Sequence, residues 1–401
     1  MMDAGQIGKR YCPEIALIVI LLRIKLGIAS REDFIRFRNE NAIGKDFVFT
    51  LIKSHELGSI VFSLKDMRDL LSDKAAGLDN SNSFELRARN NLLILAELIR
   101  INEKFRVLGI PAIFYKGVLL SYLLFDDFTT RATSDLDILI KSADFLKIRS
   151  ALLADGYEEV YFYPENYPAY YLAHTRESSY RKKFSGGHYL YIELQWAPLP
   201  EYFGIPYNNG YFFDHMQDIK VGGTKISTLN VTQHLLLLII HHGISDIWRN
   251  LKHVFDLAVL ISRYNDSINW QEVYNKGIEW HKEVNFSCGL NLVYLVFGVS
   301  PLKPAPWKTN AQTNQLVMES LLSFPLIGKS KKNRENIKRQ LLLCDNRKER
   351  ISLEKGYLKI AFWPSLIDLE NIKLPAKLFP LYFITKRLRF LFPGKKISAG
   401  I

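Results

Sequence analysis

The stretch that decides the fold is Ser134-Asp135-Leu136-Asp137, which opens an apolar run ending at residue 140. In a β-strand, residues two apart project from the same face, so Asp135 and Asp137 point together while Leu136 and Ile138 face a core. Two carboxylates this close repel each other unless a cation lies between them. Because Mg²⁺ prefers carboxylate oxygens together with water and phosphates, the pattern indicates a magnesium site, able to hold two ions for an in-line phosphoryl displacement.

A third acid belongs on a neighbouring strand, flanked by apolar residues that bury the strand. Ile192-Glu193-Leu194 has this form. We expect Glu193 to complete the metal-binding set with Asp135 and Asp137, and to accept the proton of an attacking hydroxyl.

Phosphates also need donors, and a glycine at the start of a helix lets backbone N–H groups approach them closely. Lys116-Gly117 stands between a predicted strand, Ala112 to Tyr115, and a predicted helix, Val118 to Phe125. Lys116 adds a point charge there, and Arg131 or Lys141 can neutralise a further oxygen. We predict that the phosphate side of the site contains Lys116, Gly117, Ser134 and Arg131.

The remaining pattern predicts an α+β fold in which a small mixed β-sheet is flanked by helical regions. A helix capped by Ser142 runs from Ala143 to Ala154, and a turn at Gly186-Gly187 leads into a strand from His188 to Trp196. Apolar residues at helical spacing fill the chain on both sides. We predict a helical region over residues 1–105, an α/β core over 106–230, a helical domain over 231–370 and a basic aromatic tail over 371–401.

Composition narrows the class of protein. A chain of 401 residues with 48% hydrophobic residues can bury two or three cores. A formal charge of +12 indicates a polyanionic partner or serves solubility alone. Three scattered cysteines fit a reducing cytoplasm. The apolar run from Ile15 to Leu22 is too short to span a bilayer, so we interpret it as a buried helix.

The tail allows two interpretations. Its 31 residues contain seven Lys or Arg, no acid and several interleaved aromatic residues. It either contacts an anionic surface, such as a membrane or nucleic acid, or packs on the body as a helix with a solvated basic face.

Taken together, these motifs resemble the uncharacterised nucleotidyltransferase family within the polymerase β-like superfamily. Glu193-Leu194-Gln195-Trp196 is similar to the family's Glu-Leu-His-Trp strand, with Gln195 in place of histidine. The other matching positions are Phe114-Tyr115-Lys116-Gly117, Arg131, Asp135-Leu136-Asp137, Gly156-Tyr157, His241 or His242, Trp248 and Asp256-Leu257.

The resemblance implies transfer of a nucleoside monophosphate from a nucleoside triphosphate such as ATP to a hydroxyl of a small molecule or protein. In that reaction Asp135, Asp137 and Glu193 would hold Mg²⁺. Two other classes stay open: a glycosyltransferase, whose Asp-x-Asp also binds a metal, and a non-catalytic, antitoxin-like binding module with a nucleotidyltransferase fold.

Three further features have a structural interpretation beside a functional one. Adjacent residues lie about 100° apart on a helix, so His241 and His242 are not expected to chelate one ion. Asp256 orients a base or an acceptor, or pairs with Arg249 or Lys252. The aromatic segment from residue 157 to 171 forms a lid over an acceptor cleft or a hydrophobic cover over the sheet.

Overall fold

A computed structural model describes residues 12–64, 80–184, 188–205, 210–326 and 333–391. The described chain mixes many helices with a five-stranded sheet and a two-stranded sheet, which confirms the predicted α+β class. The predicted turn at Gly186-Gly187 and the end of the basic tail lie outside the described residues.

The N-terminal part is helical, as predicted. Helix α2 is buried all round from Ile15 to Leu22, which confirms the interpretation of this run as a core helix. Pro13 occupies its first turn, where the missing N–H costs nothing. Ser30 and Asp33 form a capping box at the start of α3. The bounds are α2 (Pro13–Lys25), α3 (Arg31–Glu40), α4 (Lys45–Ser54), α5 (Gly58–Phe62) and α7 (Asn80–Val107).

The main sheet has the order β1-β2-β5-β4-β3. Strands β2 and β5 are parallel, and the other neighbouring pairs are antiparallel. The bounds are β1 (Ala112–Phe114), β2 (Asp135–Ile140), β3 (Glu158–Glu159), β4 (Glu177–Lys183) and β5 (Tyr189–Gln195). The mixed sheet and the predicted strands are therefore present, each with ends within about a residue or two of the prediction.

Helices connect the strands on both sides of the acidic strand. Helix α8 (Gly117–Phe125) joins β1 to β2, and α9 (Phe145–Ala154) follows β2. The expected cap by Ser142 is wrong: Ser142 begins a short 3₁₀ turn, η1 (Ser142–Asp144), and its side chain caps neither helix. Tight 3₁₀ turns are common at helix starts and satisfy part of the same backbone groups. The next elements are α10 (Pro168–His174), η2 (Glu201–Phe203) and α11 (Gly210–Asp214).

A hairpin separates the sheet from the C-terminal helices. Strands β6 (Met216–Val221) and β7 (Thr224–Leu229) pair across Gly222-Gly223, both of which have positive φ as a tight turn requires. Asn230 then caps α12 by accepting from the N–H groups of Thr232 and Gln233.

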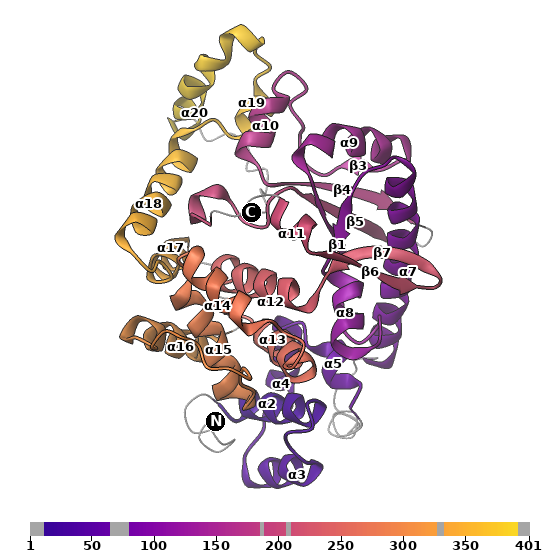
Figure 1. Cartoon of the computed structure of the whole chain (residues 1–401), viewed down its shortest axis with the longest axis vertical. Coiled ribbons are helices and arrows are strands. Elements are labelled where there is room, and N and C mark those ends of the chain that lie inside the picture. Colours follow the sequence, from indigo (N-terminus) through magenta and orange to yellow (C-terminus); the bar gives the residue numbers. More distant parts are fainter. Residues whose placement is uncertain (1–11, 65–79, 185–187, 206–209, 327–332, 392–401) are drawn as a thin grey trace.

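The C-terminal helices begin with α12 (Val231–Ile240), which continues into η3 (His241–Ser245), a π-helical turn. The last of them, α18 to α20, lie at the opposite end of the molecule from α3 (Figure 1). The bounds of the others are α13 (Leu251–Tyr264), α14 (Trp270–Glu279), α15 (Glu283–Phe297), α16 (Ala311–Ser323), α17 (Asn333–Leu342), α18 (Arg347–Phe362), α19 (Leu366–Asn371), η4 (Ala376–Leu381) and α20 (Tyr382–Leu391).

Two apolar cores hold these elements together. One core joins α2, α4 and α5 to α12, α13 and α15, so the N-terminal helices pack against helices that follow the hairpin. The second core joins α7 to the sheet and to α9, and Figure 1 shows α7 running along the sheet. The predicted domain boundaries themselves stay a prediction. Among the described residues, no helix is both long enough and apolar enough to cross a membrane.

Candidate active site

Strand β2 presents its two aspartates as the alternation predicts. Leu136 and Ile138 are buried in the second core, whereas Asp135 and Asp137 project from the opposite face. In the parallel pairing of β2 with β5, Asp137 lies directly beside Glu193. Neighbouring strands are about 4.8 Å apart, so three carboxylates share one face of two adjacent strands. We call Asp135, Asp137 and Glu193 the carboxylate site.

Gln195 belongs to this site, although the sequence analysis did not select it. Its amide Nε2 donates to Asp137 Oδ1 at 3.1 Å and to Glu193 Oε2 at 3.3 Å. The hydroxyl of Tyr115 donates to its Oε1, which fixes the orientation of the amide. The available signal was the spacing: Gln195 is two residues beyond Glu193 and so points to the same face.

Burial and the neighbouring acids raise the pKa values of two of the three carboxyls. Burial raises the pKa of Glu193 to about 7, and the charges of Asp137 and Asp135 add to this. Burial also raises the pKa of Asp135 to about 6, with a further contribution from Asp137. Carboxylates that resist ionisation in the apoprotein are stabilised by an added cation.

The three acids offer the ligand atoms of a hard divalent cation. One of these atoms, Asp137 Oδ1, already contacts nitrogen donors: Lys116 Nζ lies 3.5 Å away and the Gln195 amide 3.1 Å away. The three carboxylates supply only oxygen ligands, which is the set that Mg²⁺ prefers.

Lys116 and Gly117 lie beside the acidic strand, at the start of α8. Burial disfavours the charge of Lys116, but the Asp137 carboxylate raises its pKa and keeps it protonated. Gly117 has a φ of +57°, and a Cβ there would lie 3.1 Å from both the Asp135 carbonyl oxygen and Thr133 Oγ1. Only glycine therefore lets the helix start approach the acidic strand this closely.

The other predicted phosphate-binding residues differ in their surroundings. Ser134 is exposed at the head of β2. Arg131 is buried, and its guanidinium contacts both carboxylate oxygens of Asp256 at 3.0 to 3.2 Å. Asp256 thus pairs with Arg131 and not with Arg249 or Lys252, because α13 packs against the segment that leads into β2. The ion pair holds the Arg131 guanidinium in place. Its positive charge also acts on Asp135 and opposes the rise in the pKa of that carboxyl.

Two further cations near the site were missed. Arg176, just before β4, donates to the Pro198 carbonyl and pairs with Glu177 at 2.9 Å. Lys252 on α13 forms an ion pair with Glu56. Tertiary packing brings both cations near the carboxylate site. The charge of Arg176 lowers the pKa of Lys116, and the charge of Lys252 lowers that of Asp135. Their distance along the chain from residue 135 left no local pattern to read.

The aromatic segment covers the sheet. The rings of Tyr163 and Tyr171 pack around Phe145 with centroid distances of 5.8 and 5.6 Å, and Trp196 completes the group. Both tyrosines are buried in the second core. Of the two interpretations of this segment, the packing favours the hydrophobic cover.

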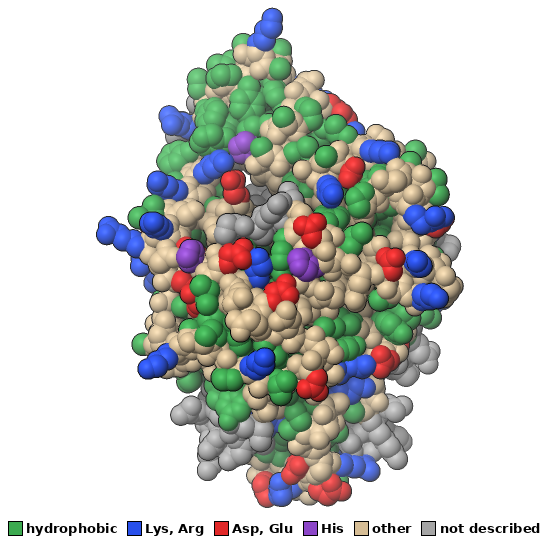
Figure 2. All heavy atoms as spheres, in the orientation of Figure 1, with side chains coloured by type: hydrophobic (Ala, Val, Ile, Leu, Met, Phe, Trp, Pro, Cys, Tyr) green, Lys and Arg blue, Asp and Glu red, His purple; other side chains and the backbone are tan. Residues whose placement is uncertain are grey.

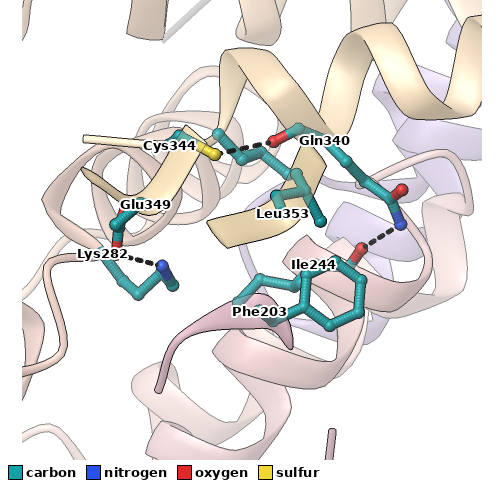
Figure 3. A pocket seen from close by; sticks show the side chains of 8 residues that line it. Phe203, Ile244, Lys282, Gln340, Cys344, Glu349 and Leu353 are labelled. Carbon is teal, nitrogen blue, oxygen red and sulfur yellow. Dashed lines mark hydrogen bonds and ion pairs between the residues drawn. The ribbon is translucent and has the colours of Figure 1, made fainter. Parts of the chain in front are cut away.

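A separate pocket lies among the C-terminal helices (Figure 3) and is distinct from the carboxylate site. Lys282 and Glu349 form a buried ion pair at its edge, and Gln340 donates to the Ile244 carbonyl at 3.2 Å. Because these polar groups already satisfy each other, the pocket provides no converging set for a ligand. It is lined by Phe203, Ile244, Lys282, Gln340, Leu343, Cys344, Glu349 and Leu353.

Comparison with known proteins identifies the family of the chain. No curated protein matches the chain. A solved structure with some similarity is an antigenic nucleotidyltransferase-like protein from Paracoccidioides brasiliensis, 16% identical, covering 51% of this chain and 92% of its own, with a TM-score of 0.30. The family model of an uncharacterised nucleotidyltransferase matches residues 42–298, which include the whole carboxylate site. The chain therefore belongs to the uncharacterised nucleotidyltransferase family, as the resemblance of its motifs predicted.

Proposed function

We propose that the protein is a Mg²⁺-dependent enzyme that transfers a nucleoside monophosphate from a nucleoside triphosphate to a hydroxyl of a small molecule or protein. The observation that carries the proposal is the register of β2 and β5. It pairs Glu193 with Asp137, and Asp135 lies two residues before Asp137 on the same face. Membership of the nucleotidyltransferase family supports the same class of reaction.

In the proposed reaction, the acceptor oxygen forms a bond to the α-phosphorus while the bond from that phosphorus to the bridging oxygen breaks. Pyrophosphate leaves, and the acceptor's proton passes to a carboxylate and then to solvent. Glu193 is the proposed proton acceptor because its carboxylate lies beside Asp137 on the same face of the sheet. Mg²⁺ held by Asp135, Asp137 and Glu193 would neutralise charge that develops on the phosphate oxygens.

The chain's own residues position the triphosphate. Lys116 supplies a positive charge at the acids, and the N-terminal N–H groups of α8 lie behind Gly117. Gln195 holds the Asp137 and Glu193 side chains in one orientation through its two N–H donors. Arg131, anchored by Asp256, supports the segment that leads into the acidic strand.

A direct test uses all four nucleoside triphosphates labelled at the α-phosphate, with Mg²⁺ and a panel of hydroxyl acceptors that includes the protein itself. We expect label to be transferred by the wild type and lost in Asp135→Asn and Asp137→Asn. Transfer at the wild-type rate by either variant would contradict the assignment. Glu158→Gln serves as the matched control, because it changes an exposed acid on β3 at the far edge of the same sheet.

Other functions make different predictions. A binding-only module would show no Mg²⁺-nucleotide binding by calorimetry or would bind without transfer. A glycosyltransferase would hydrolyse sugar nucleotides, but such folds place several βα units before the acidic motif, and in the described part of this chain only β1 precedes it. Its three unpaired cysteines, Cys12, Cys288 and Cys344, fit the reducing cytoplasm, where we expect the enzyme to act.

A further inference from the structure

Three histidines surround one carboxylate at the junction of α12 and α13, outside the carboxylate site. Asp246 Oδ2 lies 3.4 Å from His241 Nδ1, 3.2 Å from His242 Nδ1 and 3.4 Å from His253 Nδ1. The rings of His242 and His253 stack at 3.9 Å. We call these four residues the histidine cluster.

Hydrogen bonding does not account for this convergence. Among the described residues, only His242 Nδ1 has hydrogen-bond geometry to Asp246. The Nδ1 atoms of His241 and His253 and the Nε2 atom of His242 have no hydrogen-bond partner in this part of the chain. Exposed fractions of these side chains are 17% for His241, 4% for His242 and 15% for His253. Buried polar atoms without partners are costly, so their presence requires a reason.

The distances match those between ligands of one tetrahedral metal ion. Ligand atoms about 2.05 Å from zinc are separated by about 3.3 Å at the tetrahedral angle. The separations of 3.2 and 3.4 Å from Asp246 Oδ2 to the Nδ1 atoms of His242 and His241 agree with this value. Ligand atoms of His241, His242 and Asp246 also lie within 4.8 Å of one another.

The backbone is built to bring these side chains together. His241 and His242 begin the π-helical turn η3, and the Nδ1 atoms of both rings lie within 3.4 Å of Asp246 Oδ2. The expectation that they do not chelate one ion assumed a regular α-helix, which is interrupted at this turn. A Cβ at Gly243 would lie 1.8 Å from Asn285 Oδ1, so only glycine permits this packing.

The surroundings hold the turn rigid. Asn285 donates to the Ile239 carbonyl at 3.1 Å and accepts from the Trp248 indole at 3.0 Å. Ile247 and Trp248 both have φ above +50°, a conformation that costs free energy for non-glycine residues. Strained backbone held by buried contacts is typical of functional positions.

We propose that His241, His242 and Asp246 bind a transition-metal ion of the zinc class, with His253 stacked behind His242 as a positioning residue. Two imidazoles and one carboxylate form a ligand set that zinc accepts while keeping a further position for water or substrate. Imidazole nitrogen disfavours Mg²⁺, so this site and the carboxylate site would select different ions.

The cluster is a neighbour of the carboxylate site. The charge of Lys116 acts on His241 and on Asp246 as well as on Asp137. The proposal does not depend on nucleotidyl transfer, since metal binding can be measured without any substrate.

The test titrates the full-length protein, freed of any affinity tag and of metal, with Co²⁺ in excess Mg²⁺ that occupies the carboxylate site. We expect one equivalent to bind with the strong visible absorption of a tetrahedral ion. His241→Gln or Asp246→Asn should weaken Co²⁺ and Zn²⁺ binding by about a hundredfold or more. His55→Gln is the matched control, because His55 is equally buried but both of its ring nitrogens are engaged, with the Phe324 carbonyl and the Leu251 N–H.

A gain of signal guards against variants that fold poorly. His241→Cys should add a thiolate-to-cobalt charge-transfer band in the near ultraviolet. Absence of tetrahedral Co²⁺ in the wild type, or binding that His241→Gln, Asp246→Asn and His55→Gln reduce equally, would overturn the proposal in favour of a purely structural histidine cluster.

An independent observation concerns the C-terminal end of the molecule. Large apolar side chains are exposed on α18 to α20, with Leu358 at 58%, Phe362 at 56% and Ile384 at 55%. Figure 2 shows hydrophobic side chains gathered at the end of the molecule that Figure 1 assigns to these helices. The apolar end comprises Leu358, Ile360, Phe362, Trp363, Ile372, Leu378, Leu381 and Ile384.

Basic side chains accompany this apolar end. Lys359, Lys373, Lys377 and Arg387 are exposed, and Glu370 is the exposed acid between residues 358 and 387. Tyr382 and Lys386 are buried, and Lys386 donates to the Ile360 carbonyl at 2.7 Å, so the segment is packed on the body while its apolar residues face outward.

We infer that the apolar end docks on a membrane surface that carries anionic lipids. Exposed apolar area among lysines matches the acyl boundary and the phosphate headgroups of such a surface. Binding to nucleic acid would use the cations but leave the aliphatic side chains in water.

Flotation with vesicles tests this inference. We expect wild-type protein to float with phosphatidylcholine vesicles containing phosphatidylglycerol and to float less with phosphatidylcholine alone. The double variant Phe362→Ser, Ile384→Ser should bind at least fivefold less, whereas Val107→Ser, Leu302→Ser, at exposed apolar positions elsewhere, should bind like wild type. Equal flotation of both double variants, or RNA binding without vesicle binding, would overturn it.

Discussion

The carboxylate site and the histidine cluster both contain an acid that raises the pKa of Lys116, but the two groups of residues are brought together in different ways. The first arises from strand geometry, because alternation on β2 and pairing with β5 bring the acids to one face. The second arises from a break in helical geometry at η3, which no spacing rule anticipates. A group of residues on regular strands can be predicted from the sequence, whereas one that depends on an irregular turn cannot.

The largest expected effect is on the carboxylate site. Asp137→Asn should lower kcat/KM for nucleotidyl transfer by at least about a thousandfold, because a metal stabilises the reacting phosphate by several kcal/mol and each 1.36 kcal/mol is tenfold. Steady-state kinetics at saturating Mg²⁺ measure this loss. Asp246→Asn should leave Mg²⁺ affinity at the carboxylates within about twofold of the wild type, since the two sites use separate ligands. A large loss of Mg²⁺ affinity in Asp246→Asn would show that the two regions form one site.

A buried ion pair joins α13, the helix that carries His253, to the segment that leads into the acidic strand. Asp256→Asn leaves the buried Arg131 guanidinium without its carboxylate, and removing one partner of a buried pair costs about 3–5 kcal/mol. Urea unfolding monitored by circular dichroism should show this decrease in the free energy of unfolding. The exposed pair Arg106–Glu103 is the control, and Glu103→Gln should leave the urea midpoint unchanged. A wild-type midpoint for Asp256→Asn would mean that the pair contributes little.

Gln195 tests how far the carboxylate site depends on its neighbours. Gln195→Ala removes the amide that orients Asp137 and Glu193, and loss of such a supporting contact typically costs about 10- to 100-fold in metal affinity. Calorimetric titration with Mg²⁺ measures the change, and Gln195→Glu should not restore the affinity because it removes the N–H donors. Unchanged affinity in Gln195→Ala would assign the residue to packing alone.

The smallest effect is on pH dependence. With pKa values raised to about 7 for Glu193 and about 6 for Asp135, the metal-free folded state binds more protons than the unfolded chain, in which both groups ionise near pH 4. These groups therefore stabilise the fold below pH 4, relative to high pH, and that stability decreases as pH rises to about 7. Buried histidines such as His242, whose pKa is lowered, act in the opposite sense and make the fold more stable as pH rises. The contribution of Glu193 should therefore be measured as the difference in thermal stability between the wild-type apoprotein and Glu193→Gln, which should change over this range.

Mg²⁺ should bind more tightly over the same range, by about tenfold from pH 6 to pH 7, because its ligands must lose their protons. Added Mg²⁺ should also restore the stability lost at high pH. A difference in stability between the wild-type apoprotein and Glu193→Gln that stays constant between pH 5 and 7 would contradict the raised pKa of Glu193.

Much of the fold could be predicted because local patterns specify it. The strand carrying Asp135 and the strand carrying Glu193 have polar and apolar residues in the alternation of a β-strand. The helix at residues 15–22 was predicted from an uninterrupted apolar run that is too short to span a bilayer. The prediction of a cap at Ser142 was wrong because a 3₁₀ turn and a capped α-helix start with the same residues.

The sequence by itself determined the identity of the three carboxylates, the glycine that lets α8 approach them and the family to which the chain belongs. Tertiary structure alone decided that Arg131 pairs with Asp256, that Gln195 bridges two acids, and that three histidines meet at Asp246. The physical reason is range. Strand alternation acts over two residues, whereas these contacts depend on how α12 and α13 pack against the sheet, which is set by the whole apolar core.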